Sequence, residues 1–322
     1  SLPFTSFSAS TAQSAKGWGS VNFVLIMDFS YRAKIQHITA LKRSNQRDAA
    51  LSVPCRFQDE FIEMPAPNSL RPPLRHDPIE RFTFDEIDGT NAFGTRWIKL
   101  AKAAGEAVIL SQNQTAGRGQ HGRDWSTSAG EDLAWSYVRR FEPETSIESD
   151  ALVSLNKAWT LATLGTLRRY LSPDQTLGIK WPNDLFLLSS QGWRKLGGIL
   201  IETSWRGSHC QGIVLGIGVN LNSHRAHAPG QAISILDACG LTTDLASLSR
   251  DLEEAIRNAW PNDSTSDEFN ENLLFRGEKR LFNVSGEPQT GVFLGALENG
   301  MGQFQWETRR QEHAQGEVTW IW

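Results

Sequence analysis

This sequence contains few cysteines and no long apolar run. It also has no excess of positive charge. Its three cysteines, Cys55, Cys210 and Cys239, stand at irregular spacing. This spacing fits neither a zinc-ligand pattern nor a disulfide framework, and it favours a reducing compartment, which we take to be the cytoplasm. No apolar run reaches the roughly 18 residues that span a bilayer, so we expect no membrane partner. The formal net charge of -4 provides no global field for nucleic acid.

What remains is the composition of a globular chain, with 39% hydrophobic residues among 322. Residues 1–80 differ from the rest, because a Ser- and Thr-rich beginning is followed by a proline-rich stretch over residues 65–78. Proline disfavours helix and removes backbone donors, so we predict a poorly ordered extension and linker over residues 1–80. This extension shows no convincing helix-turn-helix. Because the chain does not begin with methionine, Met27 and Met64 are candidates for the natural start.

From residue 81 onward, strand and helix patterns alternate along the chain. We predict strands at residues 82–87, 107–111, 133–139, 177–180 and 211–220, and a hairpin from 185–188 and 195–202. We predict helices at residues 92–104, 146–171 and 244–260. After residue 277 the chain shows short strands separated by glycine turns, which is typical of a small β-barrel. The pattern therefore predicts an α/β domain over residues 81–268 and a β domain over residues 269–322.

The stretch QTAGRGQHGRDW at residues 114–125 is the most informative one in the chain. Its glycines let the backbone approach a ligand and present N–H groups to it. Arg118 and Arg123 can fork onto a phosphate or a carboxylate, and Trp125 offers a flat apolar face. The stretch predicts a loop that wraps an anionic, partly apolar ligand. A flexible surface turn is the alternative, because short glycine motifs often have no function.

Further polar residues follow predicted strands. In KWPND, Asp184 can hold a Mg²⁺ that accompanies a nucleotide, whereas an Asx turn is the structural alternative. Lys195 precedes an apolar strand, where it can stabilise charge on a carboxylate attacking a phosphate or can simply be exposed. The strand GIGVN ends at Asn220, an amide suited to ribose or phosphate, unless its glycines only mark bulges. Thr90 and Asn91 can bind a polar head group, cap a helix, or do both.

The order and spacing of these motifs say more than any single motif. GRGxxGRxW, KWPND, RKLGGILIE and GIGVN follow one another within residues 82–222. In this order they closely resemble the biotin protein ligase (biotin–[acetyl-CoA-carboxylase] ligase) family, and a Gly-Glu-Val run at residues 316–318 extends the resemblance weakly. The resemblance implies a mixed, mainly antiparallel sheet with flanking helices, followed by an SH3-like barrel.

The resemblance also implies a two-step reaction. Biotin's carboxylate attacks the α-phosphate of MgATP, which gives biotinyl-5′-AMP and pyrophosphate. A specific lysine of a biotin carboxyl carrier protein then attacks the adenylate, and AMP leaves. ATP, Mg²⁺, biotin and the carrier of a biotin-dependent carboxylase are the expected substrates and partners, and a homodimer stays open.

Family roles carry over to the matching positions of this sequence. The expected biotin contacts are Gly89, Thr90, Asn91, Gln114, Arg118, Gly119, Gln120, Lys195 and Gly198. The expected ATP contacts are Gly117, Arg118, Arg123, Trp125, Asn183, Asp184 and Asn220. Lys195 and Arg118 would be catalytic, and Asp184 would hold Mg²⁺ through the nucleotide.

Two positions depart from the family pattern. The family often has serine where Gly89 stands and arginine where Gln120 stands. Loss of a charge at Gln120 predicts weaker retention of the adenylate by about 1–2 kcal/mol, the difference between charged and neutral hydrogen bonds.

Three alternative functions were weighed against the ligase. A DNA-binding repressor is disfavoured because residues 1–80 show no winged helix, so we expect a monofunctional ligase without a DNA-binding domain. A lipoate- or octanoate-transferring enzyme would share the catalytic fold, but it typically lacks KWPND together with the GRGxxGRxW loop. A non-catalytic binding protein is disfavoured by the presence of Lys195, Arg118 and Asp184.

Overall fold

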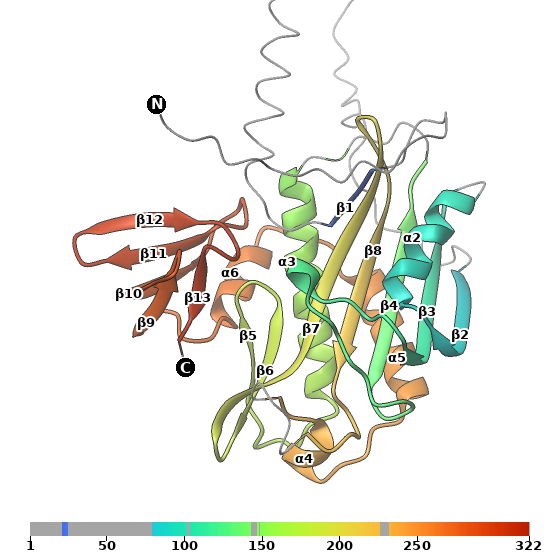
Figure 1. The fold of residues 1–322 in the computed structure, drawn as a ribbon, viewed down its shortest axis with the longest axis horizontal. Coiled ribbons are helices and arrows are strands. Elements are labelled where there is room, and N and C mark those ends of the chain that lie inside the picture. Colours follow the sequence, from blue (N-terminus) through green and yellow to red (C-terminus); the bar gives the residue numbers. More distant parts are fainter. Residues whose placement is uncertain are drawn as a thin grey trace, which may run out of the picture.

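The computed structural model describes residues 21–24, 79–101, 104–142, 147, 149–225 and 232–321. A mixed central sheet with helices on its faces lies beside a smaller β-sheet (Figure 1). The predictions of a linker, of a natural start at Met27 or Met64 and of no DNA-binding helix concern residues 1–20 and 25–78, which lie outside the described residues. Among the described helices, none is long and apolar enough to cross a membrane.

The central sheet has the strand order β2-β3-β4-β8-β7-β6-β5, and β1 (Val21–Val24) pairs with β7 off this path. The seven strands of the path are β2 (Ile79–Ile87), β3 (Gly105–Gln114), β4 (Leu133–Arg140), β8 (His209–Val219), β7 (Gly192–Arg206), β6 (Asp184–Ser189) and β5 (Leu177–Lys180). Only β2 and β3 pair in parallel, because helix α2 (Thr90–Leu100) makes the crossover between them. The predicted mixed, mainly antiparallel sheet is confirmed.

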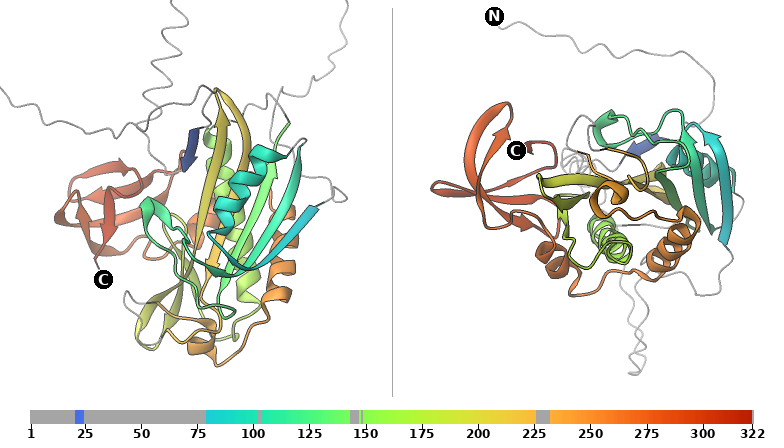
Figure 2. Two further views of the ribbon diagram at one scale, coloured as in Figure 1. Left: turned by 45° about the vertical axis from the view of Figure 1, so that its right-hand side comes forward. Right: turned by 90° about the horizontal axis from the view of Figure 1, so that it is seen from below.

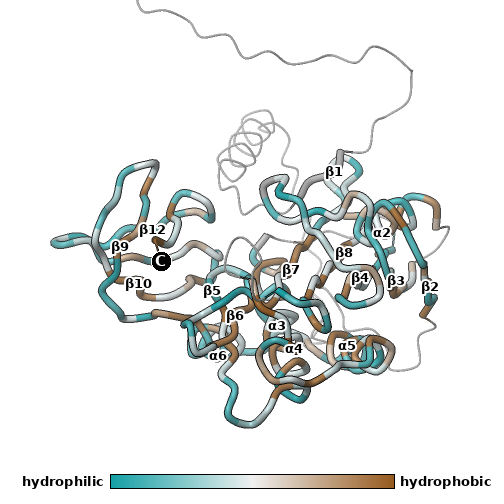
Figure 3. Tube along the Cα trace, turned by 60° about the horizontal axis from the view of Figure 1, so that its bottom comes forward, coloured by the Kyte–Doolittle hydropathy of each residue, from teal (hydrophilic) through white to brown (hydrophobic). Residues whose placement is uncertain are grey.

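Helices cover both faces of the sheet. Helix α2 lies on one face, while α3 (Ser149–Arg168) and α5 (Leu245–Asn258) lie on the other (Figure 2). Strand β4 is therefore buried on both sides: Trp135 faces the core under α3 and α5, and Val138 faces the small core under α2. Figure 3 shows hydrophobic residues along β7 and β8 and mainly hydrophilic residues in the outer loops.

Helix α2 begins two residues before the predicted helix and is capped differently. Its N-cap residue is Gly89, which has no side chain to cap with. Instead, Gln114 Oε1, from the end of β3, accepts the backbone N–H of Thr90 at 2.9 Å. The prediction that Thr90 or Asn91 caps this helix with its side chain is therefore wrong, because the acceptor is Gln114 at the end of β3. The short helices α4 (Ile235–Cys239) and α6 (Thr265–Glu271) were not predicted.

The C-terminal β domain is confirmed as a five-stranded antiparallel sheet. Its strands are β9 (Lys279–Val284), β10 (Glu287–Ala296), β11 (Gly302–Trp306), β12 (Arg309–His313) and β13 (Val318–Trp320), and β12 was not predicted. Phe282, Phe293 and Phe304 form its aromatic core. Trp181 of KWPND packs on this core. Its ring centroid lies 5.9 Å from that of Phe293 and 6.3 Å from that of Phe304. The motif therefore joins the two domains.

Candidate active site

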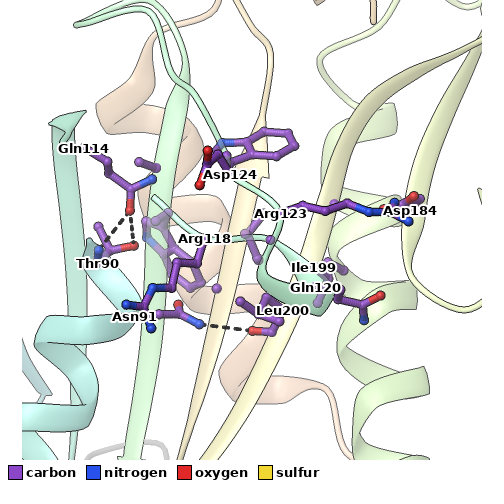
Figure 4. A pocket seen from close by; sticks show the side chains of 18 of the residues that line it. Thr90, Asn91, Gln114, Arg118, Gln120, Arg123, Asp124, Asp184, Ile199 and Leu200 are labelled. Atoms are coloured by element: carbon purple, nitrogen blue, oxygen red, sulfur yellow. Dashed lines mark hydrogen bonds between the residues drawn. The ribbon is translucent and has the colours of Figure 1, made fainter. Parts of the chain in front are cut away.

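A cavity lies between the glycine-rich loop and the α2 face of the sheet (Figure 4). It is lined by Thr90, Asn91, Gln114, Arg118, Gly119, Gln120, Arg123, Asp124, Trp125, Ala134, Trp135, Asp184, Lys195, Gly198, Ile199, Leu200, Gly216, Ile217 and Gly218. The cavity thus collects most of the predicted site residues from elements far apart in sequence.

Glycines open a trough across the two central strands. Gly216 and Gly218 lie on the same face of β8, and Gly198 of β7 pairs with Gly218. A Cβ at Gly216 would lie 2.8 Å from Asn91 Cγ, and one at Gly218 would lie 2.6 Å from Trp125 Nε1. Both positions must be glycine so that Asn91 and Trp125 can rest on the sheet. The two-residue spacing of Gly216 and Gly218 was the sequence signal for this trough.

The glycine-rich loop closes on itself like a small hairpin. Trp125 N–H donates to Gly117 O at 2.9 Å, and Gly119 N–H donates to Arg123 O at 2.6 Å. Gly122 has φ +72°, a conformation that favours glycine. A Cβ at Gly117 would meet the carbonyl oxygen of Trp125. These contacts argue against the alternative of an unstructured surface turn.

The Asp184 end of the cavity carries two cations, Arg123 and Lys195, whereas the Arg118 side chain reaches toward Asn91 (Figure 4). Arg118 and Arg123 are exposed, and within the described part of the chain their guanidinium groups make no hydrogen bond or ion pair. Lys195 Nζ donates to Asp184 Oδ1 at 2.7 Å and lies 5.9 Å from the Trp125 ring. The arrangement therefore offers three cations and one carboxylate to an anionic ligand.

A half-buried lysine, Lys180, lies near these charged groups. Burial lowers the pKa of Lys180, the neighbouring Asp184 carboxylate raises it, and the positive charges of Lys195 and Arg123 lower it further. The backbone of Lys180 on β5 is in register with that of Asp184 on β6. Lys180 therefore contributes to the electrostatics of this end although it does not line the cavity.

The opposite end carries hydrogen-bonding side chains, and the Arg118 side chain reaches toward it (Figure 4). The Ser136 Oγ lies 2.7 Å from both Thr90 Oγ1 and Asn91 Oδ1. Asn91 Nδ2 donates to Glu202 Oε2 at 2.8 Å. Figure 4 shows Thr90, Asn91 and Gln114 gathered at this end, with Asp184 at the far end. Sequence reasoning missed Ser136 and Glu202, whose only signal was a polar residue inside an apolar strand.

Four predicted residues do not line the cavity. Gly89 precedes Thr90 at the start of α2, and Gly117 accepts the Trp125 N–H within the loop. Asn183 is buried and donates its side-chain amide to Ile199 O, and the buried Asn220 donates to Ile233 O at 3.2 Å. These amides hold the strand ends that carry the charged residues. Direct contacts of the four residues with biotin or ATP stay predictions.

The loop also touches the C-terminal domain. Gln315, between β12 and β13, donates its side-chain amide to Gln120 Oε1.

Trp125 Nε1 is buried and has no hydrogen-bond partner among the described residues. A ligand with an acceptor near the indole would satisfy this nitrogen.

The site offers few ligands for a metal ion. Among the described residues there is no group of three or more His, Cys, Asp or Glu side chains that could hold one. Asp184 supplies a single carboxylate, and Mg²⁺ is commonly bound by one or two carboxylates together with substrate phosphates. The donor set therefore fits Mg²⁺ only as an ion that arrives with a nucleotide.

The chain is similar in sequence to proteins of one known family. A model of the biotin/lipoate A/B protein ligase family matches residues 84–220. The chain is 39% identical over 135 residues to a biotin–[acetyl-CoA-carboxylase] ligase of Paracoccus denitrificans, covering 42% of this chain and 51% of the relative. It is 33% identical over 219 residues to the corresponding ligase of Mycobacterium tuberculosis, covering 60% and 75%.

A solved structure shows the same fold. The biotin protein ligase from Aquifex aeolicus, in complex with biotin and ATP, superposes with a TM-score of 0.56 at 20% identity, covering 74% of this chain and 97% of that one. The chain spans about half the length, 51%, of several curated relatives that it matches. Since it covers 75% of the M. tuberculosis ligase at 33% identity, this chain belongs to the biotin/lipoate A/B protein ligase family.

Proposed function

We propose that the protein is an ATP-dependent ligase that activates biotin as biotinyl-5′-AMP and transfers it to a lysine of a biotin carboxyl carrier protein. One observation carries the proposal: a single cavity has a hydrogen-bonding end around Asn91 and a cationic end around Lys195 and Arg123. A ligand with a polar ring at one end and a carboxylate at the other fits both. The named ligases among the relatives of this chain act on acetyl-CoA carboxylase, which supports a carrier protein as acceptor.

In the first step, a carboxylate oxygen of biotin attacks the α-phosphorus of ATP. The bond from that phosphorus to the bridging oxygen breaks, and pyrophosphate leaves. Both reactants are anionic, so the step needs cations near the reacting groups, and Arg118, Arg123 and Lys195 all line the cavity. Asp184 holds Lys195 in place at 2.7 Å. Mg²⁺ bound by the phosphates and Asp184 would supply further neutralisation of charge.

In the second step, the amine of the acceptor lysine attacks the carbonyl carbon of the adenylate. The carbon–oxygen bond to AMP breaks, an amide forms, and the amine loses a proton. The mixed anhydride reacts with water, so the site must exclude solvent between the two steps. The hairpin around Gly117 and Trp125 covers the cavity, and its tip at Gln120 contacts the C-terminal domain. This lid is suited to protecting the intermediate.

Pyrophosphate release in the presence of ATP and Mg²⁺ tests the proposal, with biotin, lipoate and octanoate compared side by side. Label transfer to a purified carrier domain should follow. We expect release and transfer with biotin, and loss of at least about 10²-fold in Lys195→Ala, because a preorganised charge is removed from the transition state. Lys99→Ala, which removes an exposed cation from the last turn of α2, is the matched control and should keep full activity.

The outcomes separate the alternatives. Release with lipoate in place of biotin would assign the protein to the lipoate branch of the family. Tight binding of biotin without turnover would leave a binding protein and reject the ligase.

A further inference from the structure

The polar end of the cavity is organised by a carboxylate that does not itself line the cavity. We infer that Glu202 is a positioning residue, which fixes the orientation of the Asn91 amide and so selects a cyclic urea head group. The inference rests on the proposed function and deepens it, since it assigns the side chain that sets how the head group is recognised.

The Asn91 amide has a single satisfied orientation. Its Nδ2 lies 2.8 Å from Glu202 Oε2 and 3.4 Å from Leu200 O. An ionised carboxylate and a backbone carbonyl can only accept hydrogen bonds. The nitrogen must therefore face these two groups, and Oδ1 must face the cavity and Ser136.

The orientation of the Asn91 amide also fixes the hydrogen-bond direction of its neighbour Ser136. We call Asn91, Ser136, Thr90 and Gln114 the floor of the site. Because Asn91 Oδ1 cannot donate, the Ser136 hydroxyl donates to it at 2.7 Å. Thr90 Oγ1 also lies 2.7 Å from Ser136 Oγ, and the Thr90 hydroxyl donates to Gln114 Oε1 at 3.3 Å. On the other side of Thr90, Gln114 Oε1 accepts the Thr90 backbone N–H at 2.9 Å. The Gln114 Nε2 group therefore remains available as a donor. The floor thus presents an acceptor at Asn91 and a donor at Gln114.

A cyclic urea complements this floor, because it carries N–H donors on either side of a carbonyl acceptor. A dithiolane ring or a plain aliphatic end carries neither, and it would leave the polar groups of the floor without partners. Sites built for hydrogen bonding reject such analogues strongly for this reason. Glu202 therefore acts on selectivity through Asn91, at the end of the cavity away from Lys195 and Asp184.

Glu202→Gln tests the inference, because glutamine has a donor that allows the Asn91 amide to turn over. We expect the KM for biotin to rise about 10-fold, while kcat and the KM for ATP stay within about twofold. Desthiobiotin keeps the urea and should lose the same factor. Octanoate has no head group, so its inhibition constant should not change. Glu202→Asp keeps a group that only accepts and should recover part of the loss.

Thermal unfolding of each variant shows whether it is folded. Ser136→Ala provides a second test, since it breaks the same chain of hydrogen bonds at another residue and should also raise the KM for biotin selectively. Glu253→Gln is the control, because it removes a carboxylate from an ion pair with Arg81, at 2.6 Å, outside the cavity.

An unchanged KM for biotin in folded Glu202→Gln, with a wild type that uses biotin, would overturn the inference alone. Parallel changes for biotin, ATP and octanoate would also overturn it, because they would indicate a general structural role. A wild type that activates lipoate rather than biotin would overturn both the inference and the proposed function.

Discussion

Gly218→Ala places a methyl group under the Trp125 indole and tests whether the glycine trough positions this ring. The new Cβ would lie 2.6 Å from Trp125 Nε1 and 2.7 Å from Cζ2. Carbon atoms in contact prefer about 3.5–4.0 Å, so the ring must move by roughly 1 Å. No hydrogen bond of the indole opposes the movement, because Nε1 has no hydrogen-bond partner among the described residues. Overpacking of this kind costs about 1–3 kcal/mol of stability.

The activity should fall more visibly than the stability. A displacement of 1 Å near a reacting centre can cost up to about 10²-fold, so we expect kcat/KM for ATP in pyrophosphate release to fall about 10- to 100-fold. In a Trp125→Ala background the same substitution should cost little, because the clashing ring is gone. The two substitutions should therefore be strongly non-additive.

Gly165→Ala is the matched control. Gly165 is exposed on α3, and a Cβ there would have no neighbour within 4 Å. Alanine in a helix should raise the free energy of unfolding by about 0.5–1 kcal/mol and leave activity unchanged. If folded Gly218→Ala kept the wild-type kcat/KM for ATP, or if its loss were simply additive with that of Trp125→Ala, the assigned position of the indole would be refuted.

Three further predictions concern the two departures from the family pattern and one tyrosine. Gln120→Arg should slow dissociation of the adenylate about 10-fold, by about 1–2 kcal/mol, and a filter-binding chase with labelled adenylate that shows no slowing would reject it. Gly89→Ser should fit, because the nearest atom to a Cβ there would be Ala116 O at 3.6 Å. As a helix cap, the serine should raise the free energy of unfolding by about a few tenths of a kcal/mol. A lower unfolding midpoint in denaturant would contradict this. Burial, followed by the hydrogen bond to Asp251, raises the pKa of Tyr170 from 10.0 to about 12. The folded state thus binds the Tyr170 proton more tightly than the unfolded state does. The resulting stabilisation of the folded state is complete below about pH 10 and is lost as the pH rises toward about 12. Tyr170→Phe should flatten the dependence of the free energy of unfolding on pH in this range, and an unaltered slope in urea titrations would count against it.

The sequence predicted those parts of the fold that depend on local pattern. Alternation of apolar and polar residues located the strand that became β2 to within three residues, and glycine spacing marked the loop at residues 114–125. The cap of α2 was mispredicted because its acceptor, Gln114, lies 24 residues away from Thr90. Glu202 was missed for a similar reason, since 111 residues separate it from Asn91 and only the sheet brings them together. Residues whose roles depend on strand pairing leave little local signal.

The KWPND motif shows why one short sequence can carry so much of this resemblance. Each of three side chains serves a different part of the molecule: Trp181 packs into the aromatic core of the C-terminal domain, Asn183 binds the backbone of β7, and Asp184 binds Lys195. These contacts lie within the four consecutive residues that lead into β6 at Asp184, so the C-terminal domain is packed against the segment that carries the partner of Lys195. Gln315 adds a second connection, from the same domain to the tip of the loop at Gln120. The C-terminal domain therefore bears on the cavity from two sides, on the residue pair at its cationic end and on the lid that covers it.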